Sequence, residues 1–542
     1  MDYNIMAIRT TDIMAANGDY SNVCGFRFFL VVFAVFLVVA SSVVFARDWQ
    51  IVPTVDVQTT FSDNINLGSS GSEKMAFVSE MNPGISIINR GRLDMDLNYR
   101  MQNIINEGGD FGYKMHHQLQ ANANAELVKR RLFLDVSSTA SQQNLTNTGR
   151  NARDNLSSVG NRSDIYTFRV SPSWRPRLNG YVSGLVRGGY ETVMLASGGA
   201  SDSETYFANV NLISGHRFSR VTWAANFNNR KINRSGGNDV LSIGNNDVLF
   251  RDYDATLRYH LYRKFNVFVR AGYFDNEFQR QTDTNKNGEF YVAGFGWIPN
   301  RWFQFEGSGG QNLYTATLTL NPTRRTTLQG TYRNTEVGTN IGTTWNGLIR
   351  HRTRRTVLEA RYFEDTTTTQ DVLLGETIFE TRDQFGNLLT GPATRQPLGA
   401  SFGIPTLTDE VLERRRGEVS FTGNTGKSTF RLVGYQEDRS FLNSGNEEQS
   451  IGVITSWNWR FTTRTQANIG MQWTRNTDSE ADDRRDKRWD VSLALTRNLA
   501  TFKNYAKAMF ATVEYRHTTQ TSSLPANEYD ENRISANINV RF

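Results

Sequence analysis

The sequence is poor in the residues that mark most other protein classes. Its 542 residues include one cysteine and ten prolines, which excludes a disulfide framework and a cysteine-based metal site. Beyond position 46 no apolar run approaches the about 20 residues of a spanning helix, so a polytopic helical membrane protein is excluded. The 60 basic and 54 acidic residues are scattered along the chain, and without basic clusters there is no basis for a nucleic-acid partner.

The single long apolar run lies near the N-terminus. Residues Phe28 to Ala40 are uncharged and apolar, Arg27 precedes them, and Val44-Phe45-Ala46 offers small or medium residues to a signal peptidase. This order predicts a secretory signal peptide over residues 1–46. Its removal would take the only cysteine, Cys24, with it. An uncleaved inner-membrane anchor is the alternative.

Period-two alternation of apolar and polar residues fills the rest of the chain, residues 47–542. One example interleaves polar residues with Leu93, Met95, Leu97, Tyr99 and Met101, and the last one contains Ile534, Ala536, Ile538, Val540 and Phe542. Such a segment forms a strand with one apolar and one wet face. The segments are about ten residues long, as a tilted strand that crosses a membrane requires.

The connections between these segments alternate between short and long. The short ones are basic or contain proline, as at 262–264 and 321–325, whereas the long ones, such as 141–163 and 366–413, are polar. The pattern predicts an all-β fold: a transmembrane, antiparallel, up-and-down β-barrel of about 24 strands, within a range of 22 to 26. Short turns would face the periplasm and long loops the exterior. The predicted location is the cell outer membrane of a Gram-negative bacterium.

A soluble β-propeller is the structural rival, because twelve hairpins over this length approach the period of a propeller blade. The distribution of tryptophan argues against it. Tryptophans gather at the ends of the predicted strands, where aromatic residues of a barrel meet the membrane interface. Those residues are Trp174, Trp297, Trp457, Trp459, Trp473 and Trp489.

The wet faces carry many arginines and acidic residues. The residues expected to line the lumen are Arg100, Arg169, Arg187, Arg258, Arg270, Arg333, Arg361, Arg431, Asp94, Asp96, Asp252, Asp254 and Glu359. Two interpretations remain open. Such residues pair across strands and brace a wide barrel, or the excess of arginine attracts an anionic polymer.

A barrel of this size needs an obstruction. Twenty-four strands at ~4.8 Å spacing and ~40° tilt enclose a backbone diameter near 48 Å. The strands begin directly after the predicted cleavage site, which leaves no plug domain. We expect the loop 366–413, alone among the loops, to fold inward and constrict the channel.

Three local patterns resemble sites of chemistry but have simpler explanations. The run Gly423–Ser428 lacks the first glycine and the helix of a phosphate-binding loop. The run Asp283–Gly288 matches half of a calcium loop, but its twelfth position is Gly294 instead of glutamate. His117 falls on an apolar face with no serine assigned to it, so an outer-membrane phospholipase is an unfavoured alternative. We predict no enzyme activity, no metal and no cofactor.

Two stretches near the mature N-terminus carry a family resemblance. They read Trp49-Gln50-Ile51-Val52-Pro53 and, further on, Phe61-Ser62-Asp63-Asn64-Ile65-Asn66-Leu67. Both resemble the opening of outer-membrane proteins of PEP-CTERM/exosortase systems, related to the β-barrel porins of exopolysaccharide gene clusters. Trp49, Pro53, Asp63 and Asn64 form the motif. The terminal Phe542 is similar to the signal recognised by the outer-membrane barrel assembly machinery.

The resemblance implies a role in moving or anchoring exopolysaccharide at the cell surface. The leading hypothesis is a porin-like outer-membrane channel for polysaccharide export. A non-conducting structural or adhesive barrel that binds surface polymer is the second. The expected partners are outer-membrane lipid and lipopolysaccharide, the assembly machinery and polysaccharide.

Overall fold

The chain folds as one closed sheet of antiparallel strands. The computed structural model describes residues 49–542, apart from 109–111, 158, 198–199, 236–246, 281–285, 376–404, 480–483 and 500–507. The predicted signal peptide, residues 1–46, therefore lies outside the described residues. No helix among the residues described is long and apolar enough to cross a membrane.

Twenty-five strand elements make up the sheet. The first part of the chain contributes β1 (Gln50–Ser62), β2 (Ala76–Asn89), β3 (Leu93–Glu107), β4 (Tyr113–Val128), β5 (Leu132–Asn144), β6 (Arg162–Trp174), β7 (Arg177–Leu178), β8 (Val182–Leu195), β9 (Asp202–Ser214), β10 (Val221–Ser235), β11 (Val248–Tyr262) and β12 (Phe265–Glu277). The second part contributes β13 (Gly288–Asn300), β14 (Phe303–Gln311), β15 (Leu313–Thr323), β16 (Thr326–Thr335), β17 (Gly342–Arg352), β18 (Thr356–Thr368), β19 (Val411–Asn424), β20 (Ser428–Phe441), β21 (Glu447–Arg460), β22 (Thr465–Asp478), β23 (Arg484–Asn498), β24 (Ala508–Ser522) and β25 (Tyr529–Arg541). A short helix, α2 (Thr369–Leu374), follows β18.

The barrel has 24 strands. Each strand pairs with the next one along the chain. The two-residue β7 continues β6, because both pair with β8, so the 25 elements form 25 − 1 = 24 barrel strands. The last strand, β25, pairs with β1 from Thr54↔Arg541 to Ser62↔Arg533 and closes the ring. Closure leaves no unpaired edge, which a membrane requires. The predicted strand number and topology are confirmed.

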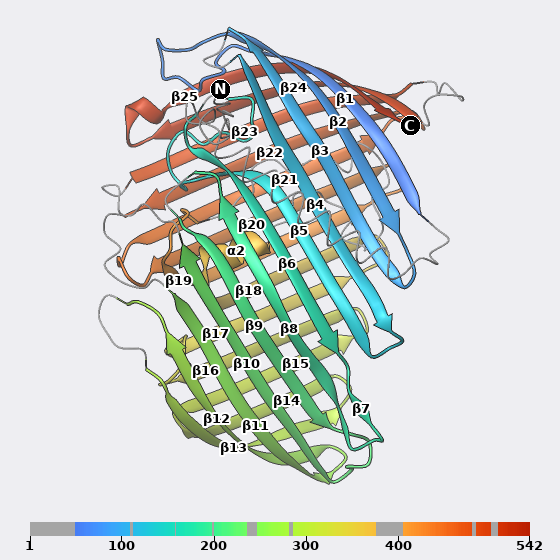
Figure 1. The fold of residues 1–542 in the computed structure, drawn as a ribbon, viewed down its shortest axis with the longest axis vertical. Coiled ribbons are helices and arrows are strands. Elements are labelled where there is room, and N and C mark those ends of the chain that lie inside the picture. Colours follow the sequence, from blue (N-terminus) through green and yellow to red (C-terminus); the bar gives the residue numbers. More distant parts are fainter. Residues whose placement is uncertain are drawn as a thin grey trace, which may run out of the picture.

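The cross-section of the barrel is elongated. In Figure 1 the strands run from left to right, so both the vertical long axis and the short viewing axis lie across the barrel. The early strands, blue to green, cross in front of the late strands, yellow to red. The short turns lie on the right, together with the C-terminus.

The predicted alternation of short and long connections has exceptions. The connection 499–507 between β23 and β24, on the short-turn side, is longer than the connection 479–483 between β22 and β23 on the long-loop side. Strands β14 and β15 are joined on the long-loop side by Asn312 alone. Asn312 takes a positive φ of 62°, which asparagine tolerates better than most residues. These two strands, at 9 and 11 residues, are also among the shortest in the wall.

The outer face of the wall is apolar and largely open. On β23 and β24 the outward residues Leu493, Leu495 and Val513 are half exposed, while their sequence neighbours point into the lumen. Outward aromatic residues stack near the short-turn rim, as with Trp457 and Trp459, whose ring centroids lie 5.6 Å apart. An apolar surface of this extent, bounded by aromatic residues, is stable against acyl chains. The protein is an outer-membrane β-barrel.

One part of the outer face is covered. Ten residues on β3 to β6 form a buried cluster, and Leu93, Ala121 and Ala125 have 0% exposure. Their orientation follows the alternation, with Asp94 and Asp96 on the opposite, inner face. The alternation therefore gives the direction of these side chains correctly, although this area is not part of the open apolar band.

Candidate functional site: the lumenal wall

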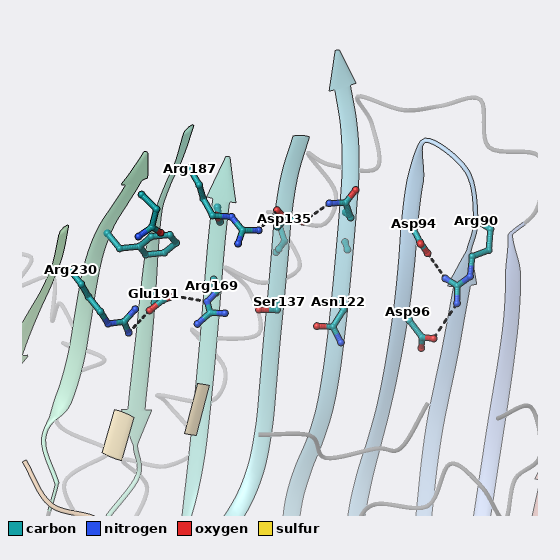
Figure 2. A pocket seen from close by; sticks show the side chains of 16 residues that line it. Arg90, Asp94, Asp96, Asn122, Asp135, Ser137, Arg169, Arg187, Glu191 and Arg230 are labelled. Atoms are coloured by element: carbon teal, nitrogen blue, oxygen red, sulfur yellow. Dashed lines mark hydrogen bonds and ion pairs between the residues drawn. The ribbon is translucent and has the colours of Figure 1, made fainter. Parts of the chain in front are cut away.

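A polar hollow of about 560 Å³ lies on the inner wall between the β2–β3 turn and β10. Alternation along the strands brings one polar side chain per two residues to this face. Figure 2 shows the side chains pointing into the hollow from adjacent strands. The lining residues are Arg90, Asp94, Asp96, Asn122, Ala123, Asn124, Asp135, Val136, Ser137, Arg169, Ser171, Arg187, Glu191, Phe207, Asn209 and Arg230.

Ion pairs organise one end of the hollow. Glu191 on β8 is 2% exposed and lies between Arg169 on β6, at 2.5 Å, and Arg230 on β10, at 2.7 Å. One carboxylate thereby joins β6, β8 and β10, and its contact with β10 spans the intervening strand β9. Because a buried carboxylate is costly unless it is paired, the two guanidinium groups offset the cost of burying Glu191.

The remaining charges of the hollow are paired as well. Arg187 contacts Asp135 at 2.7 Å, and Arg90 in the β2–β3 turn contacts Asp94 at 2.6 Å and Asp96 at 3.5 Å. The lining thus holds four arginines and four carboxylates. Its formal charge is balanced, so the hollow provides many donors and acceptors without a net field.

Phe207 brings an aromatic ring into this polar surface. It is half buried and pairs across strands with Gly189 on β8. A Cβ atom at position 189 would lie 2.5 Å from the Phe207 ring, so only glycine lets the ring lie along the wall. The ring is thereby one of the side chains that line the hollow.

Carboxamide ladders extend the polar wall beyond the hollow. Asn209 on β9 donates to Asn228 on β10 at 3.1 Å, and Asn228 donates to Asp252 on β11 at 2.9 Å. A parallel ladder runs from Asn211 through Asn226 to Asp254. Such ladders fix the amide orientation and leave a strip of polar groups along the wall.

The structure gives most of the arginines expected in the lumen an acidic partner. Beyond the hollow the pairs are Arg100 with Asp56 and Glu80, Arg258 with Glu306, Arg270 with Asp254, and Arg361 with Glu359. Arg270 binds Asp254 through two hydrogen bonds of 3.0 and 2.9 Å. The guanidinium of Arg333 lies 5.5 Å from the centre of the Phe274 ring, and Arg431 lies partly buried on β20. These contacts correspond to the bracing interpretation.

A loop that the sequence did not single out also folds onto the inner wall. Residues 145–161, between β5 and β6, contact β22 to β25 on the far side of the seam. Asp154 binds Arg516 at 2.9 Å and Arg533 at 2.8 Å. Leu156 packs with residues of β2 and β3. The expectation that only 366–413 could fold inward is wrong.

The same loop is held by hydrogen bonds along its length. Gly149 donates its backbone N–H to Asp486 at 2.6 Å, and Arg488 donates to the carbonyl oxygen of Asn151 at 2.5 Å. Asn155 donates to Gln102 at 2.7 Å. Apolar residues within a polar loop, Leu145, Leu156 and Val159, are the sequence signal that could have revealed it.

The described part of the predicted constricting loop also reaches across the barrel. In α2, Asp371 pairs with Arg230 on β10, and Leu373 packs against Ile165 and Val193 on β6 and β8. After the undescribed residues 376–404, the backbone N–H of Leu407 donates to the carbonyl oxygen of Leu145 at 2.9 Å. Helix α2 thus connects β18 with the opposite wall.

The family motif lies at the seam of the barrel. The carboxylate of Asp63 accepts the backbone N–H and the side-chain amide of Asn532 on β25, at 2.7 and 2.8 Å. Asn64 donates to the carbonyl oxygen of Asp530 at 2.9 Å. At the other end of the seam, the N–H of Phe542 donates to the carbonyl oxygen of Pro53 at 3.0 Å. Trp49 is exposed just before β1.

The patterns that resemble chemical sites take these positions. The run at 423–428 forms the hairpin turn between β19 and β20, where Thr425 donates to the carbonyl oxygen of Ser428 at 2.7 Å. Residues 283–285 of the calcium-like run lie outside the described residues. His117 Nδ1 lies 2.9 Å from the hydroxyl of Tyr99, a phenol rather than a serine. Across the described chain, no three His, Cys, Asp or Glu side chains gather as a metal site.

Comparisons with known proteins give weak likenesses only. No family model matches the chain, and no curated protein matches it. The siderophore receptor PirA from Pseudomonas aeruginosa is 10% identical over 91% of this chain and 80% of its own, with a TM-score of 0.39. OpdK with vanillate, from the same organism, is 9% identical over 91% and 99% of the two chains, with a TM-score of 0.35. A BenF-like porin from Pseudomonas fluorescens Pf-5 is 10% identical over 92% and 100%, with a TM-score of 0.33. At these values the likenesses carry no argument about activity, and the fold rests on the strand register.

Proposed function

We propose that this protein is a porin-like channel of the outer membrane that serves the export or surface assembly of an exopolysaccharide. The observation that carries the proposal is the inner wall: paired arginines and carboxylates, carboxamide ladders and the hollow beside Phe207 offer dense hydrogen bonding without net charge. A polymer rich in hydroxyl groups, each both donor and acceptor, matches such a surface. The resemblance to PEP-CTERM/exosortase-associated proteins points to the same class of cargo.

The proposal includes the partners expected of such a channel. Lipid and lipopolysaccharide would surround the apolar outer face, and the barrel assembly machinery would recognise the C-terminal strand that ends in Phe542. The exposed ring of Phe542, at 42%, is available for that contact.

A non-conducting structural or adhesive barrel is the second candidate. It is favoured by the two segments that fold onto the lumenal wall, 145–161 and α2, because both take up lumenal space near the long-loop end.

Planar-bilayer recording of the purified full chain separates the two candidates. A channel gives stable ohmic steps whose current falls when an oligosaccharide is added to the compartment. Electrical silence of protein that is shown to be folded by its heat-modifiable mobility overturns the channel and favours the structural barrel.

A further inference from the structure

The hollow between β3 and β10 has the size and the chemistry of a ligand site. Its volume of about 560 Å³ lies within the about 300–1,000 Å³ of small-ligand pockets. It combines a cavity of this size with an aromatic ring, that of Phe207. Ion pairs along the hollow hold the side chains in place: Arg169 and Arg230 with Glu191 at one end, and Arg187 with Asp135 further along (Figure 2).

The charge arrangement selects among ligands. An anion would have to displace a carboxylate from its arginine and would meet Asp94, Asp96 and Asp135 on the same surface. A cation would meet four arginines. A neutral ligand with hydroxyl groups can add hydrogen bonds to the carboxylate and guanidinium groups of these pairs without separating them.

Phe207 adds the second requirement of sugar recognition. One face of a pyranose ring carries C–H groups and is apolar, whereas its rim carries hydroxyl groups. The Phe207 ring lies along the wall over Gly189, and Asn209 of the same strand also lines the hollow. A sugar ring that lies flat on Phe207 would bury apolar area on its face and direct hydroxyl groups to the paired charges.

We infer that this hollow is a binding subsite for a neutral polysaccharide segment, with Phe207 as its stacking platform and the Arg187–Asp135 and Asn209 groups as its polar rim. The inference rests on the proposed function for its cargo and narrows it from polysaccharide in general to an uncharged one. Of the two interpretations of the lumenal arginines, it disfavours attraction of an anionic polymer, because most of those arginines are paired with carboxylates.

Binding is tested without any need for conduction. Full-length protein in detergent is titrated with a neutral gluco-oligosaccharide and, separately, with an oligogalacturonate of equal length, by calorimetry and saturation-transfer NMR. We expect the neutral probe to bind and the acidic probe to bind at least about tenfold more weakly. Equal or tighter binding of the acidic probe, or no binding of either, overturns the inference.

Variants locate the site. Phe207→Leu keeps apolar volume but removes the aromatic face, and we expect about tenfold weaker binding of the neutral probe. Phe207→Tyr should retain binding. Tyr206→Ala, which changes the outward neighbour on β9, serves as the matched control and should bind like the original protein. Leucine at 207 with unchanged affinity refutes the platform.

The outcome for this site is separable from that for the channel. If bilayers show ohmic steps but the oligosaccharides do not bind, the inference fails and the channel stands. If the neutral probe binds through Phe207 while the bilayers stay silent, the channel fails and the subsite stands.

Discussion

Asp154 is the residue at which the inner loop 145–161 is most firmly attached to the wall. It contacts Arg516 and Arg533 at 2.9 and 2.8 Å, and Arg533 also donates to Ser157 at 2.5 Å. Burial alone would raise the pKa of Asp154, but the two guanidinium groups outweigh it and hold the pKa below the ordinary value. The carboxylate therefore stays ionised and attached under all mildly acidic conditions.

We predict that Asp154→Asn loosens this loop. The change removes a charge from two arginines, which costs about 1–3 kcal/mol for hydrogen bonds of a charged group. Opening is measured by thiol labelling of an Ala152→Cys background, because Ala152 is 1% exposed. Labelling should accelerate about tenfold or more, whereas the nearby, exposed Asp530→Asn should leave it unchanged. Equal labelling rates in the Asp154 variant would refute the attachment.

The pH dependence of the same labelling follows from the lowered pKa. An acid whose pKa is lower in the folded state stabilises that state above its unfolded pKa, and this contribution is lost as the pH falls through the folded value. Labelling of the Ala152→Cys protein should therefore stay slow from neutral pH down to the ordinary pKa of aspartate, about 3.9. Acceleration between pH 5 and 6 would contradict the assignment.

The ion-pair partners of lumenal residues could not be predicted from the sequence, and the reason is physical. Alternation assigns a side chain to a face, and it did so for Arg258 and Arg270. The partner of a lumenal side chain depends on the strand register and on the distance around the wall. Arg258 on β11, for example, reaches Glu306 on β14, three strands away. Arg230 meets Asp371 of α2, a helix that follows β18 on the other side of the lumen. No local pattern encodes such contacts.

Among the elements of the fold, the Ser62-Asp63-Asn64 segment helps to close the barrel, because it binds the last strand to the first. It leaves β1 at the long-loop end and binds β25 through Asp63 and Asn64, while Ser62 donates to Glu531 at 2.6 Å. In the sequence alone, these residues carry only a family resemblance. Their role was hidden because the partners lie more than 460 positions away in the chain.

We predict that Asp63→Asn weakens the seam. Asparagine cannot accept both N–H groups of Asn532 as a charged carboxylate does, so the folded barrel should lose about 1–3 kcal/mol. The measurement is the urea concentration at which the heat-modifiable folded band disappears, which should fall. Glu73→Gln is the control, since Glu73 accepts from Gly71 within its own exposed turn and, among the described residues, no hydrogen bond or ion pair joins it to β25. A seam that tolerates Asp63→Asn as well as Glu73→Gln would show that pairing of β1 with β25 alone closes the barrel.

For the whole molecule, the strands of the barrel wall were easier to predict from the sequence than the segments that lie inside the lumen. The strand number, the closure and the inward and outward faces follow from a period of two and a requirement for no free edge. The contents of the lumen depend on loops, whose apolar residues must find a site on a curved inner surface. Leu156 and Leu373 each pack into such a site, and nothing in their own segments indicates the position of that site on the wall.

The segments inside the lumen are expected to limit the passage of ions through the barrel. Helix α2 is held against the opposite wall by Leu373, which is 2% exposed between Ile165 and Val193. Leu373→Asn would place an amide in that contact at a cost of about 2–4 kcal/mol, so α2 should detach. We expect single-channel conductance to rise in Leu373→Asn, and to rise further when residues 366–413 are replaced by a short Gly-Ser link. Val372→Asn, whose side chain is not part of the cluster, should conduct like the original protein.

If conductance stays the same in both the point variant and the deletion, the loop 366–413 does not limit the passage. The inner loop 145–161 is then the remaining obstruction among the described residues, and Asp154→Asn should raise the conductance in the same assay.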